Sequence, residues 1–297
     1  MNASRKIGLL GPAMTYSDLA SESEEMRKML GSEKKVYYSD IQKIIKAVAK
    51  GEIQKGLVPI ENSIHGTVRE TEDALFENSV EILFAYAMPI HHGLFVKGKE
   101  KFGKIKTIVS HEQALEQCRK FLEKKYPEAQ KIAYSSTMAA IEYMLKSPEK
   151  GIAAIGPRQL AHRKDLKMRS PRGGETESIE DEKTNKTVFL IIQKKPEHAR
   201  FAESVKKNSK SRRTSIAFWF RKDSPGSLYE VLREFAKAKM NLTKIESRPA
   251  TKKLGEYIFF LDFEGDEKNE KEKKVLKNIT KYIAGLKSFG SYEIIGQ

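Results

Sequence analysis

The feature that most constrains this chain is the regular alternation of strand-like and helix-like segments at its start. The strand-like runs are KIGLLG (6–11), KKVYYS (34–39) and QKGLVPIEN (54–62). A helix is expected to begin near Tyr16, and another over 40–51, where Asp40 can cap the start and Gly51 follows the end. Such βαβ alternation is typical of a parallel sheet covered by helices.

A long apolar stretch, residues 80–97, separates this set from a second alternating set. Because it contains few turn signals, it suits a strand that leaves one lobe and enters another. If the strand TNKTVFLIIQKK (184–195) returns to the first sheet, two lobes form with a cleft between them. Lobe 1 would hold about 1–84 and 170–193, and lobe 2 about 85–169. Clefts of this kind bind small anions in α/β proteins.

Residues 213–297 show a different order of elements. Strand-like and helix-like segments follow one another as βαββαβ, which predicts a ferredoxin-like domain of four antiparallel strands with two helices on one face. The expected fold class is therefore α/β, with a two-lobed part followed by this smaller domain.

The positive charge of the chain is concentrated between these two parts. The chain has 55 Lys and Arg against 40 Asp and Glu, a net charge of +15. Residues 194–213 contain eight Lys or Arg and two Glu, so they supply six of the fifteen excess charges. No aromatic platform or groove-reading motif accompanies them, so we expect a solvated linker at 194–212 and no nucleic-acid partner.

The sequence gives little support for a disulfide, a metal site or a membrane-spanning segment. Cys118 is the only cysteine, which excludes an internal disulfide and a multi-cysteine metal site. His91 and His92 are adjacent on a strand and would point to opposite faces, and His111 completes no ligand spacing, so no metal is predicted. The N-terminus does not read as a signal peptide and no run is long enough to cross a bilayer, so we expect a cytoplasmic protein without a membrane partner.

Seven short segments, in order and over nearly the whole chain, carry a family resemblance. They are GPAMTYS (11–17), GLVPIENSIHGTVRETED (56–73), SHEQALEQC (110–118), STMAA (136–140), DEKTNKTVF (181–189), SPGSLYEVL (224–232) and NLTKIESRP (241–249). Together they resemble the signature segments of prephenate dehydratases with a carboxy-terminal ACT domain. PIENS and ESRP are the most distinctive of them.

The resemblance implies a catalytic part, 1–193, shaped like a periplasmic binding protein, and an ACT domain, 213–297, that binds L-phenylalanine and inhibits the enzyme. The implied reaction is the decarboxylative dehydration of prephenate to phenylpyruvate in phenylalanine biosynthesis, without a cofactor. A homodimer or homotetramer is expected. A preference for arogenate, or a catalytically weak phenylalanine sensor, remains as an alternative.

The chemistry of prephenate limits what the protein must supply. Carbon dioxide and hydroxide depart as the ring becomes aromatic, so the electron push is internal and no nucleophile is needed. The protein must hold two carboxylates and help the hydroxyl leave, by positioning and hydrogen-bond assistance. Thr187 matches the threonine of the family motif Asn-x-Thr-Arg-Phe, so the resemblance makes it the catalytic residue.

Other polar positions in the motifs are expected to bind substrate. They are Thr15, Tyr16, Ser17, Glu61, Asn62, Ser63, Ser136, Thr137, Asn185 and Phe189. For the hydroxyl and amide residues at strand-to-helix turns, helix capping is the competing role, and one residue can serve both. Glu61 could act as an acid or orient other groups, and the sequence does not separate these roles.

Three positions depart from the family pattern. Val188 stands where the family has Arg, Met14 where it usually has Gly, and His65 where an acidic residue is common. Arginine binds carboxylates in a bidentate manner that valine cannot reproduce, so substrate binding or catalysis could be impaired. If the missing guanidinium organises neighbouring groups instead, Lys183, Lys186 or Arg172 could compensate.

In the C-terminal domain, the resemblance assigns a phenylalanine site at a subunit interface. Its expected residues are Gly226, Ser227, Leu228, Asn241, Leu242, Glu246, Ser247, Arg248 and Pro249. Backbone N–H groups at a helix start would take the effector carboxylate. Glu246 and Arg248 share one face of a strand, so we expect them to shape this site and hold the interface.

Overall fold

The computed structural model describes residues 5–98, 104–169, 178–196, 212–222, 224–250 and 257–296. Its strands are β1 (Lys6–Leu10), β2 (Lys34–Tyr38), β3 (Lys55–Asn62), β4 (Gly66–Thr67), β5 (Val80–Pro89), β6 (His92–Lys97), β7 (Thr107–His111), β8 (Gln130–Tyr134), β9 (Ile152–Pro157), β10 (Leu166–Arg169), β11 (Lys186–Lys194), β12 (Arg212–Trp219), β13 (Leu242–Pro249), β14 (Tyr257–Glu264) and β15 (Gly285–Ile295). Its helices are α1 (Tyr16–Ser21), α2 (Glu24–Leu30), α3 (Ile41–Lys50), α4 (Arg69–Glu77), α5 (Glu112–Gln117), α6 (Arg119–Lys125), α7 (Thr137–Lys146), α8 (Ser227–Lys237), α9 (Glu270–Ile279) and the 3-10 helix η1 (Arg158–His162).

Lobe 1 is built on a sheet whose order is β13-β14-β12-β15-β5-β11-β3-β1-β2, with β4 paired to β3. The pairs β1–β2 and β1–β3 are parallel, as the alternation predicts. The helix predicted over 40–51 forms as α3, where Asp40 accepts a hydrogen bond from the Lys43 N–H at 2.8 Å and Gly51 adopts φ +79°. Its buried face packs on the sheet through Ile44 and Val48.

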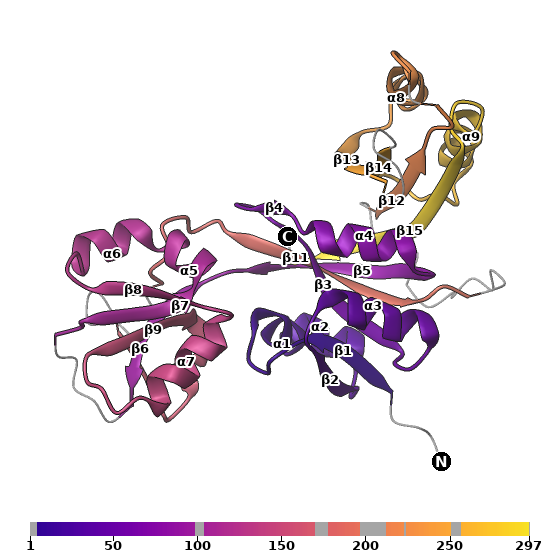
Figure 1. The fold of residues 1–297 in the computed structure, drawn as a ribbon. Helices are drawn as coiled ribbons and strands as arrows, with labels where there is room; N and C mark the ends of the chain where they lie inside the picture. Colours follow the sequence, from indigo (N-terminus) through magenta and orange to yellow (C-terminus); the bar gives the residue numbers. More distant parts are fainter. Residues whose placement is uncertain are drawn as a thin grey trace.

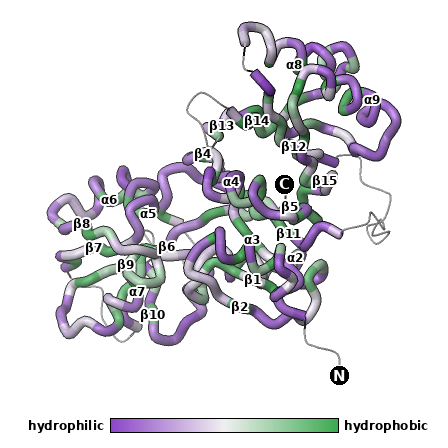
Figure 2. Tube along the Cα trace, turned by 45° about the vertical axis from the view of Figure 1, so that its right-hand side comes forward, coloured by the Kyte–Doolittle hydropathy of each residue, from purple (hydrophilic) through white to green (hydrophobic). Residues whose placement is uncertain are grey.

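Lobe 2 has its own sheet, in the order β10-β6-β9-β7-β8. The apolar stretch 80–97 divides between the two sheets, because β5 belongs to the first and β6 to the second. Strand β11 returns to lobe 1, where it lies antiparallel between β5 and β3. Figure 1 shows the two lobes side by side, joined by these crossings. Figure 2 shows that the hydrophobic stretches follow the strands, whereas α8 and α9 are largely hydrophilic.

The C-terminal part has the predicted βαββαβ order, β12-α8-β13-β14-α9-β15. Its strands pair antiparallel, and α8 and α9 cover the sheet over a core that includes Phe218, Phe235 and Phe263. Most of the basic segment expected as a linker, residues 197–211, lies outside the described residues.

One strand pairing in the sheet is not indicated by the order of strands and helices along the sequence. Strand β15 pairs in parallel with β5 through Glu293, Ile294 and Ile295, so the C-terminal sheet continues into the sheet of lobe 1. Lys287, also on β15, donates hydrogen bonds to Leu75 O, Phe76 O and Asn78 O at 2.9, 2.7 and 2.7 Å. These carbonyls end α4, so a cation from the C-terminal domain caps a helix of lobe 1.

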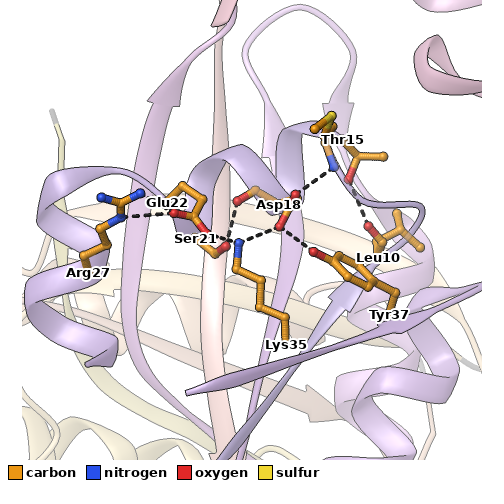
Figure 3. Close-up of polar contacts among 9 residues, drawn as sticks. Leu10, Thr15, Asp18, Ser21, Glu22, Arg27, Lys35 and Tyr37 are labelled. Carbon is orange, nitrogen blue, oxygen red and sulfur yellow. Dashed lines mark hydrogen bonds and ion pairs between the residues drawn. The ribbon is translucent and has the colours of Figure 1, made fainter. Parts of the chain in front are cut away.

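The loop that precedes α1 is held by Asp18 (Figure 3). Its carboxylate accepts hydrogen bonds from the Met14 N–H and Lys35 Nζ, both at 2.7 Å, and from the Tyr37 hydroxyl at 2.8 Å. Thr15 donates its hydroxyl proton to Leu10 O at 3.0 Å. Met14 has a φ of +66°, a left-handed conformation that glycine adopts readily and methionine rarely. The left-handed conformation explains why glycine is usual at this position in the family motif that GPAMTYS resembles.

We expect the half-buried ammonium of Lys287 to make the free energy of unfolding depend on pH in the alkaline range. Burial lowers the pKa of Lys287 from 10.5 to about 8, with a smaller contribution from Lys195. Between these values the unfolded chain binds the proton more tightly, so the free energy of unfolding should rise with pH from about 8 to about 10.5. Denaturant titrations across this range should show a smaller rise for Lys287→Met. Equal slopes for both proteins would contradict the assignment.

Replacing Met14 by glycine should stabilise the protein. The change relieves the left-handed strain at φ +66° and should raise the free energy of unfolding by up to about 1 kcal/mol. Met29→Gly is the matched control, since Met29 lies in the right-handed helix α2, where glycine should cost about 1 kcal/mol. Urea unfolding of both variants gives the comparison. A loss at position 14 as large as that at position 29 would refute the explanation.

Candidate active site

The side-chain amide of Asn62, at the end of β3, is the centre of a polar cluster. Its Nδ2 lies 2.9 Å from Thr187 Oγ1, 3.0 Å from Asn185 Oδ1 and 3.2 Å from Lys186 O. Its Oδ1 accepts hydrogen bonds from the two backbone N–H groups that follow Ser63, both at 3.1 Å. The antiparallel pairing of Thr187 with Asn62 brings these distant segments together. The structure thus gathers four of the predicted residues, Asn62, Ser63, Asn185 and Thr187.

A chain of side chains continues this cluster into lobe 2. Asn185 Nδ2 donates to Gln117 Oε1 at 3.2 Å, and the same oxygen lies 2.7 Å from His92 Nε2. The Tyr16 hydroxyl lies 2.9 Å from His92 Nδ1 and 3.0 Å from His91 O. Because Gln117 Oε1 can only accept, His92 carries a proton on Nε2, and the single proton of the Tyr16 hydroxyl has two acceptors within reach, His91 O and His92 Nδ1. Side chains of both lobes therefore share one hydrogen-bonded network.

Burial keeps the network uncharged at neutral pH. It lowers the pKa of His92, which is 2% exposed, and raises the pKa of Tyr16 well above its usual value. Glu180 borders the network and accepts from the His92 backbone N–H and from His91 Nδ1, both at 2.9 Å. Burial alone would raise the pKa of Glu180, but hydrogen bonds from Ser178 and the two histidines lower it. Glu180 thus stays ionised and holds the strand that carries His92.

Thr187 and Val188 face opposite sides of the sheet, since neighbours on a strand alternate. On the side of Thr187, Phe189 is buried in the core beneath α1 and α2. It was expected to contact substrate, and the structure places it in packing. On the other side, Val188 packs with the core that includes α3 and α4, and it is paired in register with Glu61.

A cavity of about 30 Å³ lies on this second side, between lobe 1 and the C-terminal domain. Glu61 and Val188 line it together with Arg213, Lys244 and Asp262. The cations that line this cavity with Val188 are therefore Arg213 and Lys244 of the C-terminal domain, whereas Lys183 and Lys186 do not line it and Arg172 is outside the described residues. Glu61 lies here, on the face opposite Thr187, so the geometry favours an orienting role over direct contact with substrate.

The remaining residues predicted to bind substrate lie at strand-to-helix turns. Thr15 precedes α1 and Ser17 is buried within it. Ser136 caps α7 by accepting a hydrogen bond from the Ala139 N–H at 3.0 Å, and Thr137 is the first residue of that helix. Ser136 therefore has the capping role that competes with ligand contact, and no hydrogen bond of the described residues joins it to the Asn62 cluster.

The residues expected around phenylalanine fall into three groups. Gly226, Ser227 and Leu228 stand at the start of α8, where Gly226 has a φ of +90°. Asn241 and Leu242 follow the other end of that helix, about 16 Å away along an axis of 11 residues. Along β13, Ser247 and Pro249 are exposed, whereas Glu246 and Arg248 turn to the opposite face and contact α4.

Sequence reasoning missed two members of the network. His92 was considered as a metal ligand and assigned a packing or surface role instead, and Gln117 lies inside a quoted motif but received no role. A buried amide and an imidazole that need partners were the available signal, because such groups are hydrogen-bonded in native proteins. Among the described residues, no His, Cys, Asp or Glu are grouped as a metal site requires. Within the same residues, no helix is long and apolar enough to cross a membrane.

Comparison with known proteins agrees with this architecture. A family model described as prephenate dehydratase matches residues 7–197, and one described as ACT domain matches 214–280. The chain is 37% identical to a prephenate dehydratase of Methanocaldococcus jannaschii over 95% of this chain and 96% of the relative. It is 32% identical to a prephenate dehydratase of Lactococcus lactis subsp. cremoris over 97% of this chain and 98% of the relative.

Solved structures show the same fold. The prephenate dehydratase of Arthrobacter aurescens in complex with L-Phe has a TM-score of 0.83 at 26% identity and covers 97% of this chain and 90% of that one. The enzyme of Staphylococcus aureus has a TM-score of 0.76 at 26% identity and covers 97% and 99%. The predicted fold class is confirmed. The chain therefore belongs to the prephenate dehydratase family, a family of decarboxylating hydro-lyases, and carries a C-terminal ACT domain.

Proposed function

We propose that this protein converts prephenate to phenylpyruvate and that the Thr187 hydroxyl assists the departing oxygen. The observation that carries the proposal is the contact between Asn62 Nδ2 and Thr187 Oγ1 at 2.9 Å. An amide N–H can only donate, so the Thr187 oxygen accepts here and its own proton remains available. Within the part of the chain that the structure describes, no other group takes this proton.

The hydrogen bond from Asn62 does more than orient Thr187. Donation to the oxygen polarises the hydroxyl and strengthens it as a donor, an effect that grows where water is excluded. Asn62 is itself held by Asn185 at 3.0 Å, and Asn185 by Gln117 at 3.2 Å. The network thus fixes the hydroxyl before substrate arrives, and fixed geometry is the main contribution that this reaction requires.

Some of the predicted substrate-binding residues are placed to contact a ligand directly, and others hold neighbouring side chains in position. Ser63 is exposed beside Thr187 and donates to Asn185 Oδ1 at 3.2 Å, so it is well placed to meet a ligand. Asn185 and Tyr16 are committed to other side chains and act through them. Thr15, Ser17, Ser136 and Thr137 remain proposed carboxylate contacts at strand-to-helix turns of the two lobes. The expected cytoplasmic location also stays a prediction.

Replacing Thr187 by valine tests the hydroxyl directly. Valine keeps the branched shape of the side chain but cannot donate, so kcat for prephenate should fall by about 10²- to 10⁴-fold. Thr187→Ser is the matched control and should keep most of the activity because it retains the hydroxyl. Steady-state kinetics with circular dichroism as a check on folding gives the answer. A valine variant within about tenfold of the parent would remove Thr187 from this role.

The alternative of a catalytically weak sensor rested on Val188. Since residue 188 faces the cavity next to the ACT domain, a guanidinium there would not reach the side of the sheet that holds Thr187. Arg213 and Lys244 already supply positive charge to that cavity. This placement supports turnover over the sensor alternative.

Restoring the family arginine at position 188 should therefore change little. We expect kcat/KM of Val188→Arg for prephenate to stay within about threefold of the parent, since no substrate contact is gained. Arg213 and Lys244 remain in both proteins, so the comparison isolates the added guanidinium. A gain above about tenfold would mean that the missing arginine serves the substrate after all.

We also propose that L-phenylalanine binds at the ACT domain across two copies of the chain and inhibits turnover. The Arthrobacter aurescens relative was solved in complex with L-Phe. Here two of the three expected groups, Gly226–Leu228 and Asn241–Leu242, lie at opposite ends of α8, which is about 16 Å long, so one copy cannot close both around a single amino acid. A homodimer or homotetramer would bring these groups together. Inhibition then requires tighter binding to one quaternary state.

A further inference from the structure

Helix α4 lies between the catalytic lobe and the ACT domain (Figure 1). The ring of Phe76 on α4 packs against Trp219 and Phe260 of the ACT domain, and the polar contacts between the two fall at two places. Strand β13 runs along its charged side, and Lys287 of β15 caps its C-terminal carbonyls. The helix therefore belongs to lobe 1 by sequence, whereas the ACT domain supplies several of its polar contacts.

The contacts along β13 form a row of opposite charges. Lys244 Nζ lies 2.7 Å from Glu72 Oε1. Arg248 grips Asp73 through Nη2 at 2.7 Å and Nε at 3.2 Å, a bidentate geometry. A third pair, Glu246 with Arg69 at 3.7 Å, is solvent-exposed on the arginine side and contributes little. Because side chains alternate along β13, these inner residues lie on the face opposite the exposed Ser247 and Pro249 of the ESRP segment.

The innermost pair is buried, so its partners cannot separate without cost. Glu72 is 2% exposed and the Lys244 side chain is 13% exposed. Glu72 Oε2 has no hydrogen-bond partner among the described residues, and the residue lines the interdomain cavity. Burial raises the pKa of Glu72, although Lys244 opposes this. A displaced β13 would leave a buried carboxylate without its cation, so α4 must follow the strand.

The N-terminal end of α4, which carries Glu72 and Asp73, is also tied to the strand that carries Asn62. The Thr71 hydroxyl donates to Pro59 O at 2.5 Å, and the Val68 N–H donates to Ile60 O at 2.8 Å. Both acceptors lie on β3, within three residues of Asn62. A shift of α4 therefore moves the end of β3, and with it the amide that holds Thr187.

We propose that α4 couples the ACT domain to the catalytic hydroxyl, with Arg248–Asp73 and Lys244–Glu72 as the coupling contacts. The inference rests on the proposed function and names its route of regulation. Phenylalanine bound at the ACT domain shifts β13, β13 carries α4, and α4 displaces the end of β3. Asp73 acts only through other groups and is a positioning residue.

Asp73→Asn tests the coupling. The change removes the charge that Arg248 grips but keeps the size of the side chain. The measured quantity is the affinity for L-phenylalanine in the absence of phenylpyruvate divided by that in its presence. This ratio reports the coupling between the ACT domain and the catalytic site and does not report folding. In the parent we expect a ratio of about 5 to 150, as is typical of coupled sites, and in Asp73→Asn a clearly smaller ratio, with the Lys244–Glu72 pair still in place. Glu70→Gln is the matched control, an exposed carboxylate on the same helix, and should keep the parent ratio.

Hydrogen exchange of the unmodified protein gives a second test that needs neither a variant nor turnover. Saturating phenylalanine should change the exchange of α4 amides together with those of residues 60–63. A parent-like ratio in Asp73→Asn, unchanged exchange in α4, or no phenylalanine binding would each overturn the proposal. Absence of prephenate turnover would instead refute the proposed function, and the exchange experiment would still decide whether α4 couples the domains.

Discussion

The candidate active site depends on one side chain, the amide of Asn62. It joins Thr187, Asn185 and the backbone of the following turn, and each of these contacts uses a different direction of the amide. An amide suits this position because it has two donors and an acceptor but no charge to neutralise. A carboxylate in its place would lose the donor that faces Thr187, so the residue type follows from the hydrogen-bond pattern.

Side chains alternate along strand β11, so the residue proposed for catalysis and the residue that faces the ACT domain lie on opposite sides of the sheet. Thr187 belongs to the face where both lobes meet, through Tyr16, His92 and Gln117. Val188 belongs to the face that packs toward the ACT domain. One strand therefore carries the proposed catalytic residue and a residue of the interdomain cavity side by side. This explains why the loss of an arginine at 188 need not remove a substrate contact.

The ACT domain is joined to the catalytic part through its backbone as well as its side chains. Strand β15 pairs with β5, and Lys287 caps α4 with a half-buried ammonium. Breaking either contact is costly, because it leaves backbone polar groups without partners. These contacts place the ACT domain where its displacement would be passed on to the catalytic part. A domain on a flexible tether would pass on little of its movement.

The sequence by itself determined the local elements, the ferredoxin-like order and the motif residues, because periodicity, caps and glycine positions act within a few residues. It placed Asn62, Asn185 and Thr187 in one site through the family resemblance. Only the tertiary structure decided which groups complete that site, since Gln117 and His92 come from lobe 2 and meet it across a register that no local pattern encodes. The fold also decided that Glu246 and Arg248 face α4 and that Val188 faces Arg213 and Lys244. Contacts between elements far apart in the chain depend on how whole surfaces pack, which the order of residues along one segment does not contain.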